Sequence, residues 1–532
     1  MYSNPSRLYS FSRVFLLLAV ILAASGCQAA DSSVVGRILY NEDYRHEADQ
    51  VLEGNIRVYP DQTRYLHYTG SFTAFTSELR SDQRRVYGFF FLNDLANAYE
   101  DTGNADYLHT GMAMIRQFES EAEENQDTEM MWRHGETLSR RLKHYLRFYT
   151  VAKDALSSED EALVKEAMHN LAHALAYTDL WSGLNNHGMF EDMAVMQYAR
   201  YTDDPDMYRH AVARIVTYFA KYFDADGVQL ENSPEYHMVI VEELKAFLEQ
   251  ADPKHTEGYA VLQEKYEKSH VFSNMVLLPD GTLPNIGDTK RMPIDLTEYY
   301  PEMPALSFGQ ELVRHSFYHA GYAIVKNENS YLLFRAGYIL DDHHHNDDLS
   351  FWLYKNGDIV SEVGPFGYEY TNPYSEYVRS FAAHNSLLVD GENTINEAGE
   401  VVLLDSGHAN TMQGKTTRIQ GVEWTRAIRY NENFTEITLQ DTVHSTDAKE
   451  HSYQLLFHLH PGISLQERAD GEGYDLRRQD TVIGRFFTDA TVSLTEDVYF
   501  DNYYVPGEKA QVIVLENNAQ DWTANTRIEL YP

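Results

Sequence analysis

The sequence contains only one cysteine, Cys27, in 532 residues, so no disulfide can form within the chain. Basic residues are also scarce, because 43 Lys and Arg stand against 81 Asp and Glu and give a formal net charge of −38. A chain this acidic is poorly suited to a phosphate backbone, which excludes nucleic acid as the expected partner. The acidic surplus favours solubility and still allows an anionic ligand in a locally basic cleft.

The N-terminus lacks a hydrophobic run long enough to cross a bilayer. After Arg7 and Arg13 comes an uncharged, mostly apolar run of eleven residues, 14–24, which suits the core of a signal peptide. The run ends in AASGC, which resembles a bacterial lipoprotein cleavage box. We therefore expect residues 1–26 to be a lipoprotein signal peptide and Cys27 to carry the lipid anchor. By analogy with the sorting of bacterial lipoproteins, Gln28 after the cysteine favours the outer membrane over the other exported locations, the periplasm and the cell surface. An ordinary secretion signal with an incidental cysteine is the alternative.

The length predicts two large domains, and a content of 43% hydrophobic and 13% aromatic residues indicates a globular protein. Apolar spacing is helical over residues 36–275. Three segments, NAYEDTGNADY, RFYTVAKDALSSED and ARYTDDPDMY, each read as helix, turn and helix at intervals of roughly fifty residues. Stacked helical hairpins of this kind predict an incomplete α/α toroid over residues 27–305.

Five of the fifteen prolines fall between Pro279 and Pro304, where the regular periodicity is interrupted. Beyond them the pattern alternates with period two, as in SYLLFR, LSFWLY and EITLQDTV, with NG and DG turns between the segments. This pattern predicts an antiparallel β-sandwich over residues 306–532. The fold class is therefore α+β multidomain, with the toroid preceding the sandwich.

Polar residues that could perform chemistry are concentrated in both predicted domains, so a shared site would lie at the domain seam. The four segments are NNHG (185–188), ENSPEYH (231–237), DDHHHNDDLS (341–350) and RSFAAHNSLLVDG (379–391). If the histidine cluster lies on a strand, alternation puts His343 and His345 on one side and leaves His344 facing solvent.

Together these motifs resemble the heparinase II/III-type polysaccharide lyases, a group of heparin, heparan and alginate lyases built as an α/α toroid plus a β-sandwich. The resemblance implies β-elimination at a uronic acid in an anionic polysaccharide. It implies that Asn186 and His187 neutralise the uronate carboxylate, that Tyr236 acts as acid and base, and that His343 is the catalytic histidine. A helix cap is the alternative interpretation of Asn186 and His187.

The resemblance also implies one divalent metal, with zinc as the expected ion, in a structural rather than a catalytic role. Its ligands would be His345, Glu362 and His384, since two imidazoles, a carboxylate and a water suit zinc. Glu362 is one methylene longer than the aspartate usual at this position of the group.

Four further residues are candidates for substrate binding. Arg133 and Arg140 belong to a basic stretch whose residues 133, 140, 144 and 147 share one helical face, so it could line a path for an anionic sugar or be a solvated surface. Tyr370, with Tyr374 and Tyr377 as alternatives, lies in a loop where the group often carries another site tyrosine. Arg379 opens the RS…HN segment.

Two other functions fit parts of the sequence. An α/α-toroid glycoside hydrolase would need two carboxylates, for which Glu231, Glu235 and Asp288 are candidates, but it leaves the histidines unexplained. A lipoprotein that binds the polysaccharide without cleaving it is the alternative that is not an enzyme. A zinc hydrolase is disfavoured because the chain has no HExxH motif. The motifs specify neither the polymer that is cut, nor cleavage within the chain or from its ends, nor the oligomeric state.

Overall fold

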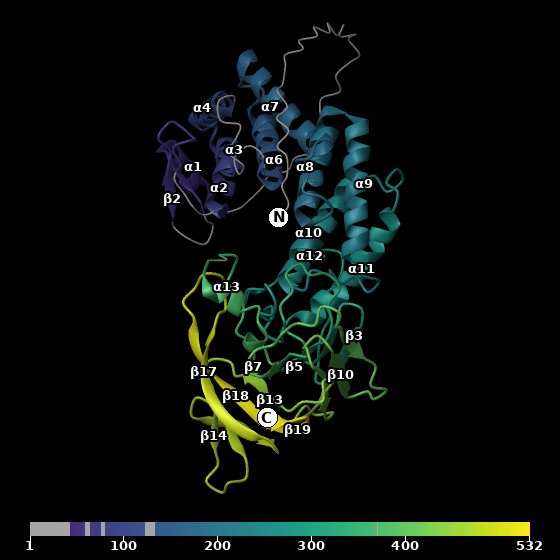
Figure 1. Cartoon of the computed structure of the whole chain (residues 1–532). Helices are drawn as coiled ribbons and strands as arrows, with labels where there is room; N and C mark the ends of the chain where they lie inside the picture. Colours follow the sequence, from purple (N-terminus) through teal and green to yellow (C-terminus); the bar gives the residue numbers. More distant parts are fainter. Residues whose placement is uncertain (1–42, 59–63, 76–79, 123–133, 370, 532) are drawn as a thin grey trace, which may run out of the picture.

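A computed structural model describes residues 43–58, 64–75, 80–122, 134–369 and 371–531. Helices form the first part of the chain and antiparallel sheets the second, so the predicted fold class is confirmed (Figure 1). The signal peptide, Cys27, Arg133 and Tyr370 lie outside the described residues. Among the residues that are described, no helix has the length and apolar character to cross a membrane.

The three predicted helical hairpins are present. Gly103, with φ +68°, ends the first helix of one hairpin, and the caps Ser157 and Asp204 begin the second helix of the other two by accepting hydrogen bonds from backbone N–H groups. The helices of this part are α1 (Tyr44–Leu52), α2 (Arg80–Tyr87), α3 (Phe91–Thr102), α4 (Ala105–Ala122), α6 (Gly135–Ala152), α7 (Ser158–Tyr177), α8 (Asn186–Thr202), α9 (Pro205–Tyr222), α10 (Pro234–Gln250), α11 (Tyr259–Val276) and α12 (Leu296–Tyr299), with a hairpin of β1 (Asn55–Arg57) and β2 (Tyr65–His67) after α1.

The basic stretch on α6 packs inside the helical domain, so the expectation of one basic face open to sugar or solvent is wrong for most of it. Arg141 is buried and donates to the Tyr87 carbonyl, and buried His144 contacts the Gly88 carbonyl. Arg147 is also buried and pairs with Glu100. Because these side chains satisfy backbone and acidic groups of neighbouring helices, they stabilise helix packing.

The second part of the chain forms three antiparallel sheets. The five-stranded sheet has β3 (Val313–Phe317), β4 (Tyr322–Lys326), β5 (Ser330–Arg335), β6 (Phe351–Lys355) and β7 (Asp358–Val360) in sequence order. The four-stranded sheet has the order β17 (Thr491–Tyr499), β18 (Glu508–Ala519), β13 (His451–His458) and β8 (Leu387–Val389). The eight-stranded sheet has the order β14 (Ile463–Glu467), β15 (Tyr474–Arg478), β16 (Thr481–Thr488), β19 (Asp521–Leu530), β12 (Glu436–Ser445), β11 (Val422–Tyr430), β10 (Thr411–Thr416) and β9 (Val401–Leu404). Helix α13 (Pro373–Tyr377) and a 3₁₀ turn at Phe381–Ala383 lie between β7 and β8.

The five-stranded sheet is a layer between two hydrophobic cores. On one face, Leu333 and Trp352 belong to the core that includes the helices. On the other face, Leu332 and Phe334 belong to the core that includes the eight-stranded sheet. All six residues of β5 are therefore buried, and its sequence, SYLLFR, is apolar on both faces instead of alternating between core and solvent.

The histidine cluster lies in a loop before β6, so the prediction that it forms part of a strand is wrong. His343 has φ +54° and Leu349 has φ +55°, and these left-handed conformations break the alternation of side chains. His344 does not face solvent as expected. Its ring stacks on Tyr338 at 3.8 Å, and burial lowers the pKa of His344 to about 2.

Candidate active site

The start of α10 fixes the position of Tyr236. Ser233 is the N-cap, its hydroxyl accepts a hydrogen bond from the Tyr236 amide at 3.3 Å, and Pro234 occupies the first helical turn. The same hydroxyl lies 2.8 Å from the Thr289 hydroxyl and donates to the Asp288 carbonyl at 2.9 Å. This SPEY sequence therefore places Tyr236 in the first turn of the helix and ties it to the segment that carries Asp288.

A second set of contacts holds the histidine loop against the residues before α10. The Asn232 amide donates to the carbonyls of Leu340 at 2.6 Å and Asp342 at 3.0 Å, and its oxygen accepts from buried Arg335 at 2.6 Å. A Cβ on Gly287, which has φ +53°, would lie 2.6 Å from the Asn232 carbonyl, so only glycine permits this approach. The helical and sheet domains meet here.

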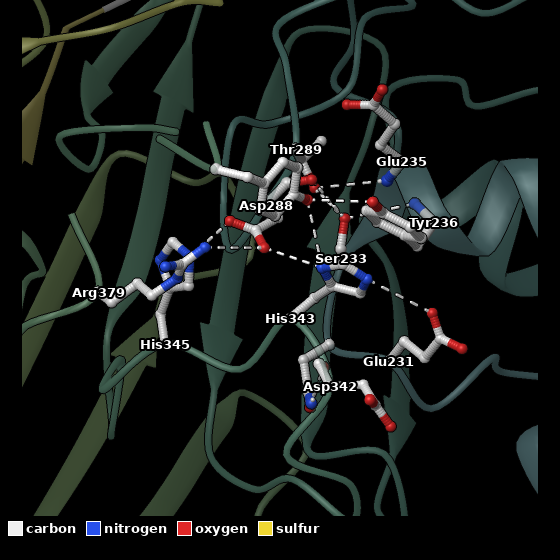
Figure 2. Close-up of polar contacts among 12 residues, drawn as sticks. Glu231, Ser233, Glu235, Tyr236, Asp288, Thr289, Asp342, His343, His345 and Arg379 are labelled. Atoms are coloured by element: carbon white, nitrogen blue, oxygen red, sulfur yellow. Dashed lines mark hydrogen bonds and ion pairs between the residues drawn. The ribbon is translucent and has the colours of Figure 1, made fainter. Parts of the chain in front are cut away.

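Tyr236, His343 and Tyr368 form the centre of the site. The rings of Tyr236 and His343 stack at 3.6 Å with 20° between their planes (Figure 2). The Tyr368 hydroxyl lies 3.1 Å from the Tyr236 hydroxyl and 3.3 Å from His343 Nδ1. Tyr368 thus bridges the phenol and the imidazole that the sequence identified.

Asp288 connects the histidines and an arginine. One of its carboxylate oxygens lies 2.9 Å from His343 Nδ1 and 3.7 Å from Arg379, and the other lies 3.0 Å from His345 Nε2 (Figure 2). Burial alone would raise the pKa of Asp288, but the hydrogen bonds from His343 and His345 outweigh it and hold the pKa far below its usual range. Asp288 is therefore an anion that orients both imidazoles.

Glu231 lies on the other side of His343. Its Oε2 is 3.8 Å from His343 Nε2 and is buried without a hydrogen-bond partner, while Oε1 accepts from the Tyr218 hydroxyl at 3.2 Å. Burial raises the pKa of Glu231 to about 7, against a smaller opposing effect of the His343 charge. Near neutral pH this carboxyl therefore exists in both protonation states.

Burial also raises the pKa of both site tyrosines above that of an ordinary phenol. For Tyr236 the hydrogen bond from Tyr368 opposes the effect in part, while for Tyr368 the charge of Asp288 adds to it. Both hydroxyls therefore keep their protons at neutral pH. In this setting Tyr236 is better suited to donating a proton than to removing one.

Asn186 and His187 lie in the first turn of α8. The adjacent Asn185 is the N-cap, because its side chain accepts from the Gly188 amide at 3.0 Å, so the capping role belongs to Asn185. His187 is half-exposed, and its Nδ1 lies 3.0 Å from Glu136 Oε2. Burial opposes ionisation of Glu136, but His187, Arg84 and Arg140 lower its pKa to about 2. The charge of His187 also acts on Glu231, which places the two residues in one electrostatic environment.

The three predicted metal ligands are buried close together. His384 Nδ1 lies 3.0 Å from Glu362, the rings of His345 and His384 are 5.5 Å apart, and His384 Nε2 is buried without a hydrogen-bond partner. This orphaned nitrogen beside a carboxylate and a second imidazole fits a divalent ion in donor type. Their ligand atoms do not all fall within 4.8 Å of one another, since His345 Nε2 is directed to Asp288 and Glu362 also accepts from Ser350.

A second group does meet that spacing within the described residues, namely His344, Asp347 and Asp348. Its carboxylates already have cationic partners, because Asp348 pairs with Arg418, and Arg335 Nε lies 3.5 Å from Asp347. Two guanidinium groups neutralise the charge that a metal would need, so this cluster is an ion-pair network.

Of the two described arginines that are candidates for substrate binding, one lies at the site and the other lies on α6. Arg379 lies at the site beside Asp288, and its guanidinium is 5.8 Å from the centre of the Tyr368 ring. Arg140 is half-buried on α6, 3.9 Å from Glu136, and so borders the environment of His187.

Sequence reasoning missed Tyr368 and treated Asp288 only as a possible hydrolase carboxylate. The sequence GPFGYEY contains Tyr368, and its glycines indicate a turn that can direct a tyrosine towards a site. The local sequence does not distinguish Tyr368 from the neighbouring tyrosines. Only its contacts with Tyr236 and His343 in the folded chain identify it.

Comparisons with known proteins agree with this architecture. The family model of the heparinase II/III N-terminus matches residues 39–308 of the sequence. The family model of the heparinase II/III-like C-terminal domain matches residues 310–529. No curated protein matches the sequence. A crystal structure of heparinase III, whose source organism its description does not give, is similar with a TM-score of 0.77 and 15% identity, covering 96% of this chain and 88% of that one.

Two other solved structures share the fold at low identity. A heparan sulfate lyase mutant from Pedobacter heparinus has a TM-score of 0.70 and 15% identity over 93% of this chain and 84% of that one. A chondroitin AC lyase from Streptomyces coelicolor in complex with chondroitin sulphate has a TM-score of 0.57 and 11% identity over 96% and 81%. With both family models matched across almost the whole described chain, this protein belongs to the heparinase II/III family and is a polysaccharide lyase.

Proposed function

We propose that this lyase cleaves a uronate-containing anionic polysaccharide by β-elimination. The observation that carries the proposal is the stacking of Tyr236 on His343, with Tyr368 bridging their polar atoms. β-Elimination needs a base at the C5 proton, an acid at the leaving glycosidic oxygen and donors for the uronate carboxylate. Three groups of residues in and around this site supply these functions.

His343 is the base in this proposal. Asp288 is held as an anion and accepts a hydrogen bond from Nδ1 of His343, which leaves Nε2 with the lone pair. Nε2 removes the C5 proton, the C–H electron pair forms the C4–C5 double bond, and the C4–O bond breaks. Because Asp288 then faces an imidazolium, its charge also stabilises the product of the proton transfer.

Tyr236 is the acid, since burial keeps its hydroxyl protonated at neutral pH. It donates that proton to the departing glycosidic oxygen. Tyr368 lies between the spent acid and the protonated base, at 3.1 Å from the Tyr236 hydroxyl and 3.3 Å from His343 Nδ1. Through this path the imidazolium can pass its Nδ1 proton to the Tyr236 phenolate. Release of the C5 proton from Nε2 to solvent, with uptake of a proton at Nδ1, then restores the starting tautomer of His343 for the next turnover.

Asn186 and His187 neutralise the uronate carboxylate in this proposal, and Arg379 adds a positive charge beside Asp288. Glu136 remains ionised and accepts from Nδ1 of His187, so a proton on the other ring nitrogen can be donated to substrate. Negative charge develops on this carboxylate as C5 loses its proton, and these donors stabilise it most in the transition state.

We further propose that His345, Glu362 and His384 would hold a divalent ion, with zinc expected, whose contribution when bound would be to brace the loops around β6 and β8. None of the steps above passes through a metal.

Two proposals concern the chain outside the site: Cys27 anchors the protein to a bacterial membrane by lipid after residues 1–26 are removed, and the toroid and sandwich meet near residue 305.

A glycoside hydrolase is disfavoured by the states of the candidate carboxylates. Asp288 is committed to two histidines, and Glu235 pairs with Lys290 at 2.9 Å and accepts from the Lys290 amide. A hydrolase needs one carboxylic acid and one available carboxylate. Glu231, whose pKa burial raises to about 7, could serve as the acid, but the contacts of Asp288 and Glu235 leave no available carboxylate beside it.

Incubation with alginate, heparan sulfate, chondroitin sulfate and bacterial exopolysaccharides tests the proposal. We expect at least one polymer to yield products that absorb in the ultraviolet, because elimination leaves an unsaturated uronate. Tyr236→Phe should lower the rate at which this signal appears by roughly 10²–10⁴ while still binding the polymer. Tyr318→Phe, which changes an exposed tyrosine between β3 and β4, is a matched control. Absence of unsaturated product from every polymer would refute the proposal.

A further inference from the structure

A hollow of about 430 Å³ lies on the outer face of the eight-stranded sheet, where β11, β12, β19 and β16 are neighbours. Along these strands Trp424, Leu439 and Ile528 are buried in the sandwich core. Since successive side chains point to opposite faces, the residues between them point outward and line the hollow. None of the residues lining this hollow belongs to the candidate active site, and Figure 1 shows β19 in the part of the sandwich away from α1–α4.

The strand register arranges the outward side chains in two rows. In the first row Arg429 is paired with Thr438, Thr438 with Arg527, and Arg527 with Phe487. Four adjacent strands at about 4.8 Å spacing make this row about 14 Å long. It therefore places two guanidinium groups and an aromatic ring on one line across the sheet.

The second row carries amide and carboxylate groups. Gln440 is paired with both Ala427 and Asn525, and its amide donates to the Asn525 side chain at 3.1 Å. Asp489 accepts two hydrogen bonds from Asn525, each at 2.8 Å, which fixes both side chains. Amide and carboxylate groups held in this way are suited to sugar hydroxyls, which both donate and accept hydrogen bonds.

The first row has the charge to hold an anion. Arg527 stacks on Phe487, 4.0 Å from the ring centre, and its charge is shared with Glu529 and Glu436. Arg429 is exposed and forms no ion pair within the described part of the chain. In a chain with a net charge of −38, an exposed arginine without an acidic partner beside a second arginine favours an anionic ligand.

We propose that this hollow is a second, non-catalytic site that binds an anionic segment of a polysaccharide. Its carboxylate or sulfate groups contact Arg429 and Arg527, its ring hydroxyls contact Gln440, Asn525 and Asp489, and a sugar face packs on Phe487. That the ligand is the same polymer that the active site cleaves rests on the proposed function. The site would keep the enzyme on the polymer between cleavage events.

Native gels containing alginate, heparan sulfate or neutral dextran test the site, with Tyr236→Phe as the parent so that the polymer stays intact. We expect an acidic polymer to retard the parent, and the double change Arg429→Ala and Arg527→Ala to weaken its affinity roughly tenfold, as expected for two lost charge-assisted contacts. Arg429→Glu alone, which breaks no contact within the described chain, should weaken it further, and dextran should retard none of them.

Arg209→Ala, which removes an exposed arginine from α9, is the matched control and should bind as the parent does. On the wild-type background, Arg429→Ala should leave turnover of a tetrasaccharide unchanged and raise KM for the polymer. The site is refuted if no acidic polymer retards the parent, if the double variant binds as the parent does, or if Arg209→Ala loses as much affinity. Failure of the lyase proposal would instead appear as absence of cleavage, while gel retardation could still be measured.

Discussion

Replacing Glu231 with glutamine should stabilise the protein above pH 7 and lose that advantage near pH 4.5. Burial raises the pKa of Glu231 from 4.5 to about 7, so in this window the folded state binds a proton more tightly than the unfolded state. The wild type therefore loses stability as pH rises from 4.5 to 7. At about 1.4 kcal/mol per pH unit, the loss is about 3 kcal/mol, and uncharged glutamine avoids it.

Urea unfolding followed by circular dichroism, from about pH 5 to about pH 8, measures this effect as the difference in unfolding free energy between variant and wild type. That difference should grow with pH by about 3 kcal/mol. A constant offset between the two proteins across this range would contradict the reasoning, because it would show that Glu231 does not titrate differently on folding. Glu249→Gln, which removes an exposed carboxyl from α10, is the control and should not reproduce the pH-dependent gain.

Four further predictions follow from the site and the N-terminus. Tyr236→Phe should lower kcat by roughly 10²–10⁴ with an unchanged thermal unfolding curve, measured by ultraviolet absorbance of the products. Asp288→Asn should lower kcat by a similar factor and change its pH profile, because His343 loses its anionic partner. Elemental analysis should find one zinc per chain that His384→Ala removes; a metal-free wild type would refute the predicted ligands. Cys27→Ala should move the exported protein from the membrane to the soluble fraction, and unchanged membrane association would exclude the lipid anchor.

The sequence predicted what depends on local patterns. The helix–turn–helix hairpins are set by residues next to one another, such as Gly103 at a helix end and Pro205 at a helix start, and all three are present. The SPEY segment likewise determines its own cap, so the placement of Tyr236 on a helix start follows from four consecutive residues.

What the sequence did not predict depends on contacts between distant segments. The left-handed conformation of His343 arises where its loop meets Asn232, and alternation alone gave the wrong geometry. Tyr368 is 132 positions from Tyr236 and is one of 39 tyrosines, so only the folded chain distinguishes it. From the sequence, the arginines of α6 could be interpreted as an exposed basic face, because their acidic and carbonyl partners lie on other helices and are not apparent in the local pattern.

The sheet between the two cores limits how this enzyme can admit a polymer. Bending the halves apart would expose Trp352 and Leu333 on one side or Leu332 and Phe334 on the other, and each would lose its favourable removal from water. The junction of the two halves is therefore rigid, and adjustment to a long chain falls to side chains that belong to neither core.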